Sequence, residues 1–289
     1  MKFPTRLATR AASGAGDKEK AKRELQEAHR LDSNHIPSRL ALARLALAEQ
    51  RPEDFDKHLN ALLELAPDTP DVLRLQAVAA QRAGDLSESV DFASRAFKSA
   101  PSTQTLLELA TYEKAAGDVE RAGALMLQWI GEHPDDIAVR LALANDLQVA
   151  NNLEAAQDQH RAVAELDTDN VVALNNLAWN LRLDNPEQAL EYIRRAALAA
   201  PDRPEVLDTL AVIEHINGEN RLADRNIKRA LAGAPENPSI RYHQAMIGAA
   251  LGEKDQAIKL LAELLAAGAP DFPEHAEAEM LMQELKGQM

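Results

Sequence analysis

The chain has 289 residues and a formal net charge of −14, and 46% of its residues are apolar although only 3% are aromatic. The acidic balance repels phosphate backbones and anionic lipid surfaces, so we expect no nucleic-acid partner. Cysteine is absent, which excludes disulfides, thiolate metal sites and cysteine nucleophiles. No run approaches the roughly 18 apolar residues of a membrane-spanning helix, so no direct membrane span is expected. A core built from alanine and leucine predicts an all-α fold.

The N-terminal segment, residues 1–34, predicts part of a helical hairpin. Its stretch "GDKEKAKRELQEAHRLD" has the pattern of a second helix, and Gly16 lies one repeat period before Gln50. The preceding "PTRLATRAAS" predicts a short, weak first helix. Arg6 and Arg10 leave an organelle-type transit peptide open as an alternative, but there is no apolar segment of the roughly 7 to 15 residues that a secretory signal requires. We favour a clipped repeat over a targeting sequence.

A period of 33 or 34 residues runs through residues 35–270. A column of alanines marks the middle of segments with helical apolar spacing: Ala43, Ala77, Ala110, Ala144, Ala178, Ala211 and Ala245. A second column follows about twelve residues later: Ala122, Ala156, Ala189, Ala223 and Ala257. Two helices approach closely only where a side chain is small, so the two columns are expected to face each other at helix crossings. The period predicts seven hairpins, which start near residues 36, 69, 102, 136, 170, 203 and 237.

Turn signals separate the two helices of each predicted hairpin. Glycine, which can take the left-handed conformation that ends a helix, occurs in "AGD", "NGE" and "LGE" at residues 83–85, 116–118, 217–219 and 251–253. "ANN" at 150–152 and "LDNP" at 183–186 have Asn and Asp there, the next most tolerant residues. A proline closes most second helices, at Pro67, Pro101, Pro134, Pro201 and Pro235, and Thr168 fills the gap in this series.

The C-terminal segment, residues 271–289, follows the last hairpin. Its stretch "FPEHAEAEMLMQELK" predicts a helix with a polar face. A stack of hairpins needs such a capping helix to cover the core that its last member would otherwise expose.

The hairpin as a whole resembles the tetratricopeptide repeat over nearly the full chain. The matching residues of the third hairpin are Leu106, Leu109, Ala110, Gly117, Ala122 and Pro134. Departures are local: Gln76 and Gln244 stand where the motif usually has Leu, and Phe55 and Ser89 where it usually has Ala. The resemblance implies an α-solenoid, a right-handed superhelix of tandem hairpins, whose first helices line a concave groove that binds a protein or peptide partner.

The sequence contains no recognisable catalytic constellation. The glycine patterns of nucleotide-binding loops, G-x-S-x-G and H-E-x-x-H are absent, so we expect neither enzyme activity nor a cofactor. The eight histidines are scattered, and no two of them have the three- or four-residue spacing of metal ligands on one helix face. His275, near Glu274, Glu277 and Glu279, comes nearest to a metal cluster, but carboxylates on a terminal helix usually serve solubility, and no metal site is predicted.

The phase of the first alanine column predicts which side chains face the groove. The later hairpins have the richer recognition chemistry and supply the predicted partner-binding residues: Asn145, Asn175, Asn176, Trp179, Arg182, Asp208, Thr209, His215, Tyr242 and His243. Trp, Tyr and Arg are enriched at interface hot spots. The alternative for Trp179 is that it packs on the neighbouring hairpin. In the earlier hairpins the same phase places Arg74 and Val78 in the groove.

The last hundred residues resemble a narrower group. "ALNNLAWNL", "PEVLDTLAVIEHINGE" and "FPEHAEAEMLMQEL" are similar to the C-terminal end of the tetratricopeptide proteins of PEP-CTERM/exosortase systems, which accompany bacterial exopolysaccharide export. Ala211 and Val212 depart from that group, which often has Gly-Trp there. The resemblance implies a non-catalytic scaffold of the cell envelope or periplasm. Members of the group are longer and carry a lipoprotein-type signal, so we hypothesise that this chain is a C-terminal portion of such an array; a complete chain without a signal would be cytoplasmic.

A rival hypothesis is a cytosolic, co-chaperone-like adaptor that binds peptide tails. The sequence also leaves open whether the exposed edge of the clipped N-terminal repeat stacks on a second copy of the chain. It does not name the partner.

Overall fold

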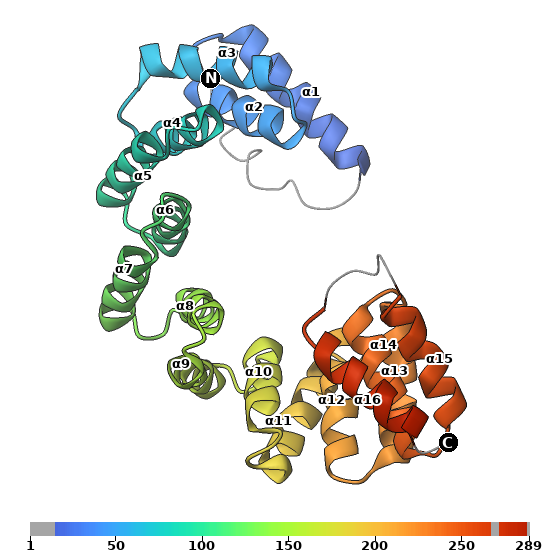
Figure 1. Cartoon of the computed structure of the whole chain (residues 1–289). Coiled ribbons are helices and arrows are strands. Elements are labelled where there is room, and N and C mark those ends of the chain that lie inside the picture. Colours follow the sequence, from blue (N-terminus) through green and yellow to red (C-terminus); the bar gives the residue numbers. More distant parts are fainter. Residues whose placement is uncertain (1–14, 267–271, 288–289) are drawn as a thin grey trace. The chain divides into compact units, whose positions relative to one another are not determined.

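The computed structural model describes residues 15–266 and 272–287. Within these ranges it contains sixteen α-helices and no strand, which confirms the all-α prediction (Figure 1). The chain divides into two compact units, Met1–Glu132 and His133–Met289, here called unit 1 and unit 2. The predicted first helix of the N-terminal repeat, residues 4–13, lies outside the described residues. No described helix has the length and apolar character needed to cross a membrane.

Unit 1 contains a single helix followed by three helical hairpins. The single helix is α1 (Ala15–Leu31). The hairpins are α2 (Ile36–Ala48) with α3 (Pro52–Leu65), α4 (Pro70–Ala83) with α5 (Leu86–Ser99), and α6 (Thr103–Ala115) with α7 (Val119–Glu132). Each first helix packs on its own second helix, and α3 and α5 also pack on the first helix of the hairpin that follows, α4 and α6.

Unit 2 contains four hairpins and a final helix. The hairpins are α8 (Ile137–Val149) with α9 (Leu153–Leu166), α10 (Val171–Leu181) with α11 (Pro186–Ala199), α12 (Pro204–Ile216) with α13 (Asn220–Gly233), and α14 (Pro238–Ala250) with α15 (Lys254–Leu264). The final helix is α16 (His275–Gly287), and its buried Ala278 and Leu285 share a core cluster with Tyr242 of α14 and Leu261 of α15.

The alanine columns form the helix crossings of both units. All seven alanines of the first column and all five of the second are at most 2% exposed. Large apolar residues fill the space around them, as Phe55 and Leu62 do between α2 and α3, and Ile193 and Ile213 do between α11 and α12. This burial confirms that close approach of paired helices is the reason for the period.

Local signals set the helix ends as the sequence predicts. Each first helix of the seven hairpins begins within one residue of its predicted start, and each closing proline lies two residues after the end of a second helix. Side chains of Asp85, Ser102, Asp136 and Asn170 accept hydrogen bonds from backbone N–H groups in the first turn of the helix that follows. The four turn glycines have φ between 80° and 92°, and Asn151 has φ 58°.

The connection at residues 183–186 differs from the prediction. We expected Asn or Asp to take a left-handed conformation there, but no residue of this stretch has a positive φ. The reason is that α10 ends early, at Leu181, so four residues join it to α11, whereas two residues join α4 to α5. The longer connection turns without a left-handed residue, and Asn185 instead caps α11, with Pro186 in the first helical turn.

Candidate functional site

The alanine side of each first helix packs on the second helices. The opposite sides of the first helices therefore form one face of each unit. In unit 2, α10 packs on α12, α12 on α14, and α14 on α16. We call the exposed and half-buried side chains on these helices the inner face of unit 2. The predicted partner-binding residues come from α8, α10, α12 and α14.

Five of the ten predicted residues come together in one cluster of unit 2, in which Tyr242 and His243 are buried, at 8% and 3% exposed. The half-buried Trp179 of α10 extends past α12 to α14, where its ring centroid lies 6.0 Å from that of His243. Tyr242 contacts the same imidazole, with ring centroids 5.5 Å apart. His243 Nδ1 lies 2.8 Å from Asp208 Oδ1 of α12, so three first helices share one cluster. Trp179 therefore contacts the second hairpin after its own and also keeps part of its surface exposed.

Arg182 completes this cluster and is its main cationic group. Its guanidinium carbon lies 4.0 Å from the Trp179 ring centroid, and its Nη1 donates a 2.7 Å hydrogen bond to the Trp179 carbonyl oxygen. Burial lowers the pKa of Arg182, and the nearby Glu274 carboxylate acts in the opposite direction. That carboxylate accepts a 2.7 Å hydrogen bond from Ser239. The guanidinium is thus held over an indole ring and beside a carboxylate.

The other five predicted residues lie outside this cluster. Thr209 is buried, and His215 lies at the end of α12 with its Nδ1 2.7 Å from Asn220 Oδ1. Asn176 donates to the Val172 carbonyl oxygen and accepts from Gln148 of α8. Two final residues differ in exposure. Asn145 is exposed on α8, whereas the Asn175 side-chain oxygen is buried without a hydrogen-bond partner within the described residues.

Unit 1 contains a groove formed by its first helices. Residues of α2, α4 and α6 line an open concavity of about 450 Å³: Arg44, Leu47, Asp71, Arg74, Leu75, Val78, Gln104, Glu108 and Tyr112. The volume lies within the range of about 300–1,000 Å³ that is usual for binding clefts. We call it the unit 1 groove. Leu47, Leu75, Val78 and Tyr112 provide its apolar surface.

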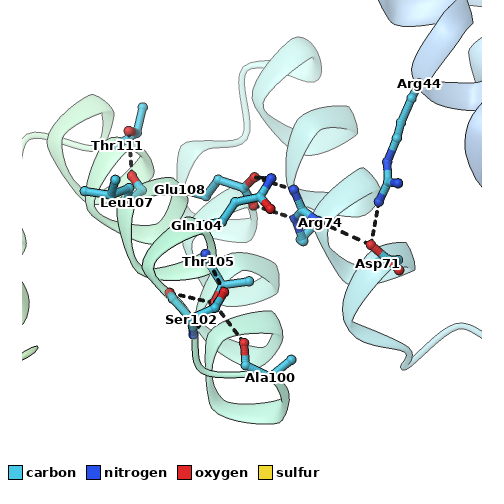
Figure 2. A network of polar contacts seen from close by, with 10 residues as sticks. All are labelled: Arg44, Asp71, Arg74, Ala100, Ser102, Gln104, Thr105, Leu107, Glu108 and Thr111. Atoms are coloured by element: carbon cyan, nitrogen blue, oxygen red, sulfur yellow. Dashed lines mark hydrogen bonds and ion pairs between the residues drawn. The ribbon is translucent and has the colours of Figure 1, made fainter. Parts of the chain in front are cut away.

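A ladder of charged side chains crosses the unit 1 groove (Figure 2). Arg44 donates to Asp71 at 2.5 Å, and Arg74 donates to the same carboxylate at 3.2 Å. Arg74 also binds Glu108 through two hydrogen bonds of 2.6 and 2.5 Å, and Gln104 donates to Glu108 at 3.2 Å. The hydrogen bonds to Glu108 are the main reason that the pKa of Arg74 is raised. The ladder fixes long side chains from three helices before any partner is present.

Comparison with known families agrees with this architecture. A family model described as "Tetratricopeptide repeat" matches residues 12–79. The structure is similar to that of a tetratricopeptide repeat protein from Parabacteroides merdae, with a TM-score of 0.60, 15% identity, and coverage of 76% of this chain and 86% of that chain. The chain has the tetratricopeptide-repeat fold.

Two further solved structures share this tetratricopeptide fold along most of the chain. Yeast Tom70 has a TM-score of 0.55 at 15% identity and covers 94% of this chain and 59% of that one. The Cut9-Hcn1 complex of the APC/C has a TM-score of 0.56 at 16% identity, with coverage of 98% and 55%. At these identities the likeness extends to the fold alone.

Curated relatives with similar sequences are bacterial. Protein HemY of Escherichia coli is 26% identical over 240 residues, which cover 80% of this chain and 60% of HemY. The TPR repeat-containing protein PA4667 of Pseudomonas aeruginosa is 25% identical over 198 residues, which cover 66% of this chain and 33% of that protein. The matched part of this chain therefore spans less than two thirds of the length of either relative.

Proposed function

We propose that this protein is a non-catalytic scaffold that binds a partner peptide or helix on the faces formed by its first helices. The unit 1 groove is the observation that carries the proposal. It combines an apolar surface, including Leu75 and Val78, with the charged ladder that crosses it. Protein interfaces commonly combine apolar contacts with hydrogen-bonding groups in this way.

The charge ladder supports binding because its members already satisfy one another. A charged side chain that loses water on binding costs free energy unless it is paired. Arg74 and Glu108 are paired in the free protein, at 2.5 and 2.6 Å, so a partner that covers them removes water without leaving a bare charge. The partner then has to supply mainly apolar side chains for the floor of the groove.

The inner face of unit 2 is proposed as a second contact surface. Trp179 and Arg182, which are half-buried, are of the residue types that contribute most to hot spots, and the guanidinium over the indole ring is preorganised by the Trp179 carbonyl. Preorganised side chains lose less conformational entropy when a partner binds. Asn145, which is exposed on α8, lies on the same series of first helices.

We also propose that the scaffold acts in a bacterial cell-envelope assembly linked to exopolysaccharide export and PEP-CTERM protein sorting. The support is the resemblance of "ALNNLAWNL" and the segments after it to that group, together with the bacterial origin of the relatives HemY and PA4667. The cytosolic adaptor is the competing hypothesis, and the two differ in the cell fraction where the partner is found.

Affinity capture with two matched variants tests the proposal. Val78→Arg places a long charged side chain in the unit 1 groove, whereas Leu127→Arg makes the same kind of change on α7, where Leu127 is 56% exposed. Captures from separated envelope and cytosol fractions are compared by quantitative mass spectrometry, with circular dichroism as the folding control. We expect an envelope partner that Val78→Arg loses and Leu127→Arg keeps. Equal capture by both variants would contradict groove binding, and partners confined to cytosolic chaperones would favour the adaptor.

A further inference from the structure

Two histidines meet between α1 and α3 at the N-terminal edge of unit 1. The rings of His29 and His58 are arranged edge to face, with centroids 5.5 Å apart. The Nδ1 atom of each ring is buried and has no hydrogen-bond partner within the described residues. His58 is 9% exposed. The pair therefore joins α1 to the first complete hairpin through a half-buried and a buried imidazole, each with a buried Nδ1 atom.

Among the charged groups around the two rings, the cations affect the pKa of the histidines more than the carboxylates do. Arg39 of α2 and Lys57 of α3 act on both rings and disfavour their protonation. Asp32, just after α1, favours protonation of His29, and Asp54 of α3 favours that of His58, although Asp54 also binds Arg51. Burial is the largest influence, and it lowers the pKa of both histidines. Burial and the two cations therefore favour the neutral form of both rings.

Helix α1 is attached to the edge of unit 1 rather than built into its core. Among the described residues of α1, none belongs to the apolar cluster that joins α2, α3 and α4. An ion pair of 2.9 Å between Lys22 and Glu49 links α1 to the end of α2, and both side chains are partly exposed. Exposed ion pairs contribute little to stability, about 0–1 kcal/mol. The histidine contact is one of the contacts that hold the helix, together with its packing on α2.

We propose that the His29–His58 contact is an acid-sensitive catch that releases α1 from unit 1 while the hairpins behind it stay folded. Protonation places two like charges 5.5 Å apart, beside Arg39 and Lys57. Release separates the two rings and exposes both of them to more water. The release uncovers the surface of α2 against which α1 packs, and the His58 ring of α3.

The sign follows from the direction of the two shifts. Docking lowers the pKa of both histidines below their ordinary value of about 6.5, so docking is at full strength above that pH and weakens as the pH falls through it. For each unit by which docking lowers the pKa of one histidine, the docking equilibrium constant falls about tenfold once the pH is below both the docked and the free pKa of that histidine. The two contributions multiply because both rings leave the contact together.

Hydrogen exchange of the full chain at pH 7.5 and pH 5.0, corrected for the intrinsic exchange rate, tests the catch. We expect the protection of α1 amides to fall about tenfold or more at the lower pH, while that of α4 and α5 stays within about twofold. The double variant His29→Gln, His58→Gln should lose this pH dependence. The control His160→Leu removes a buried histidine of unit 2 and should keep it. Unchanged α1 protection in the wild type, equal loss in the double variant, or joint loss from α1 to α5 would overturn the proposal.

A second variant decides the matter if the double variant no longer holds α1 at either pH. Lys57→Gln leaves both imidazoles and their packing in place, since Lys57 is exposed. Without this cation, protonation in the docked state becomes easier, so acid should cause a smaller loss of α1 protection than in the wild type. A loss equal to that of the wild type would contradict the catch.

Discussion

His160 occupies a position in α9 where the other six second helices of the hairpins have apolar side chains. The equivalents, each four residues after the second alanine-column position, are Leu59, Ala93, Met126, Ile193, Ile227 and Leu261. His160 is 2% exposed, and neither of its ring nitrogens has a hydrogen-bond partner within the described residues. We therefore predict that His160→Leu stabilises unit 2.

The magnitude follows from the unsatisfied ring. A buried polar group without a partner costs about 1–3 kcal/mol, and leucine has no such group while fitting the same apolar column. We expect a gain of about 1–3 kcal/mol at pH 7.5. Burial alone lowers the pKa of His160, so wild-type stability falls as the pH drops below about 6.5, the ordinary histidine value. The leucine variant lacks this penalty, and its advantage should widen at pH 5.5.

Urea unfolding followed by tryptophan fluorescence measures the effect. Unit 1 contains Trp129 and unit 2 contains Trp179, so a Trp129→Phe background makes the signal report on unit 2. Wild-type and His160→Leu chains in this background are compared at both pH values. A variant that is no more stable at pH 7.5, or an advantage that fails to grow in acid, would refute the reasoning.

Three further predictions concern the helix packing, the turns and the charge ladder of unit 1. Ala178→Leu should overpack a fully buried helix crossing and lower the unfolding free energy by about 1–3 kcal/mol in the same urea assay. Gly84→Ala should destabilise by about 1 kcal/mol because Gly84 has φ 82°. Gly123→Ala should stabilise by about 0.5–1 kcal/mol because Gly123 lies within helix α7 and has open space at the Cβ position. Calorimetric unfolding midpoints of the two variants that move in the same direction would contradict this reasoning. Arg74→Met should cost about 1 kcal/mol or less by urea unfolding, since Glu108 is partly exposed; a larger loss would mean that the ladder is a core element.

The fold could be predicted because the repeat imposes the same requirement every 33 or 34 residues. Ala178 and Ala211 must be small wherever two helices cross, and Gly84 must tolerate a positive φ where a hairpin turns within two residues. These constraints are local, so they leave a pattern in the sequence. The prediction of a left-handed residue at 183–186 was wrong because Asn185 can either take that conformation or cap the next helix, and the length of the connection decides between them.

The site was less predictable because it depends on which side chains of different hairpins meet. The phase of the alanine column placed Arg74 in the groove, but its two carboxylate partners lie on two different helices. Trp179 contacts His243 across an intervening hairpin, a distance along the chain that no local pattern encodes. A signal for the ladder existed in the sequence, since Arg74 and Glu108 are 34 residues apart, one repeat period.

Partner binding on the faces of the first helices is tested most directly by photo-crosslinking in living cells. A photoreactive amino acid is placed at Gln104, which is exposed at the unit 1 groove, or at Gln128, which is exposed on the second helix α7. Binding in the groove predicts a discrete crosslinked partner from position 104 that position 128 does not give, and that Val78→Arg abolishes. The same crosslinked partner from both positions, or from position 104 despite Val78→Arg, would contradict it.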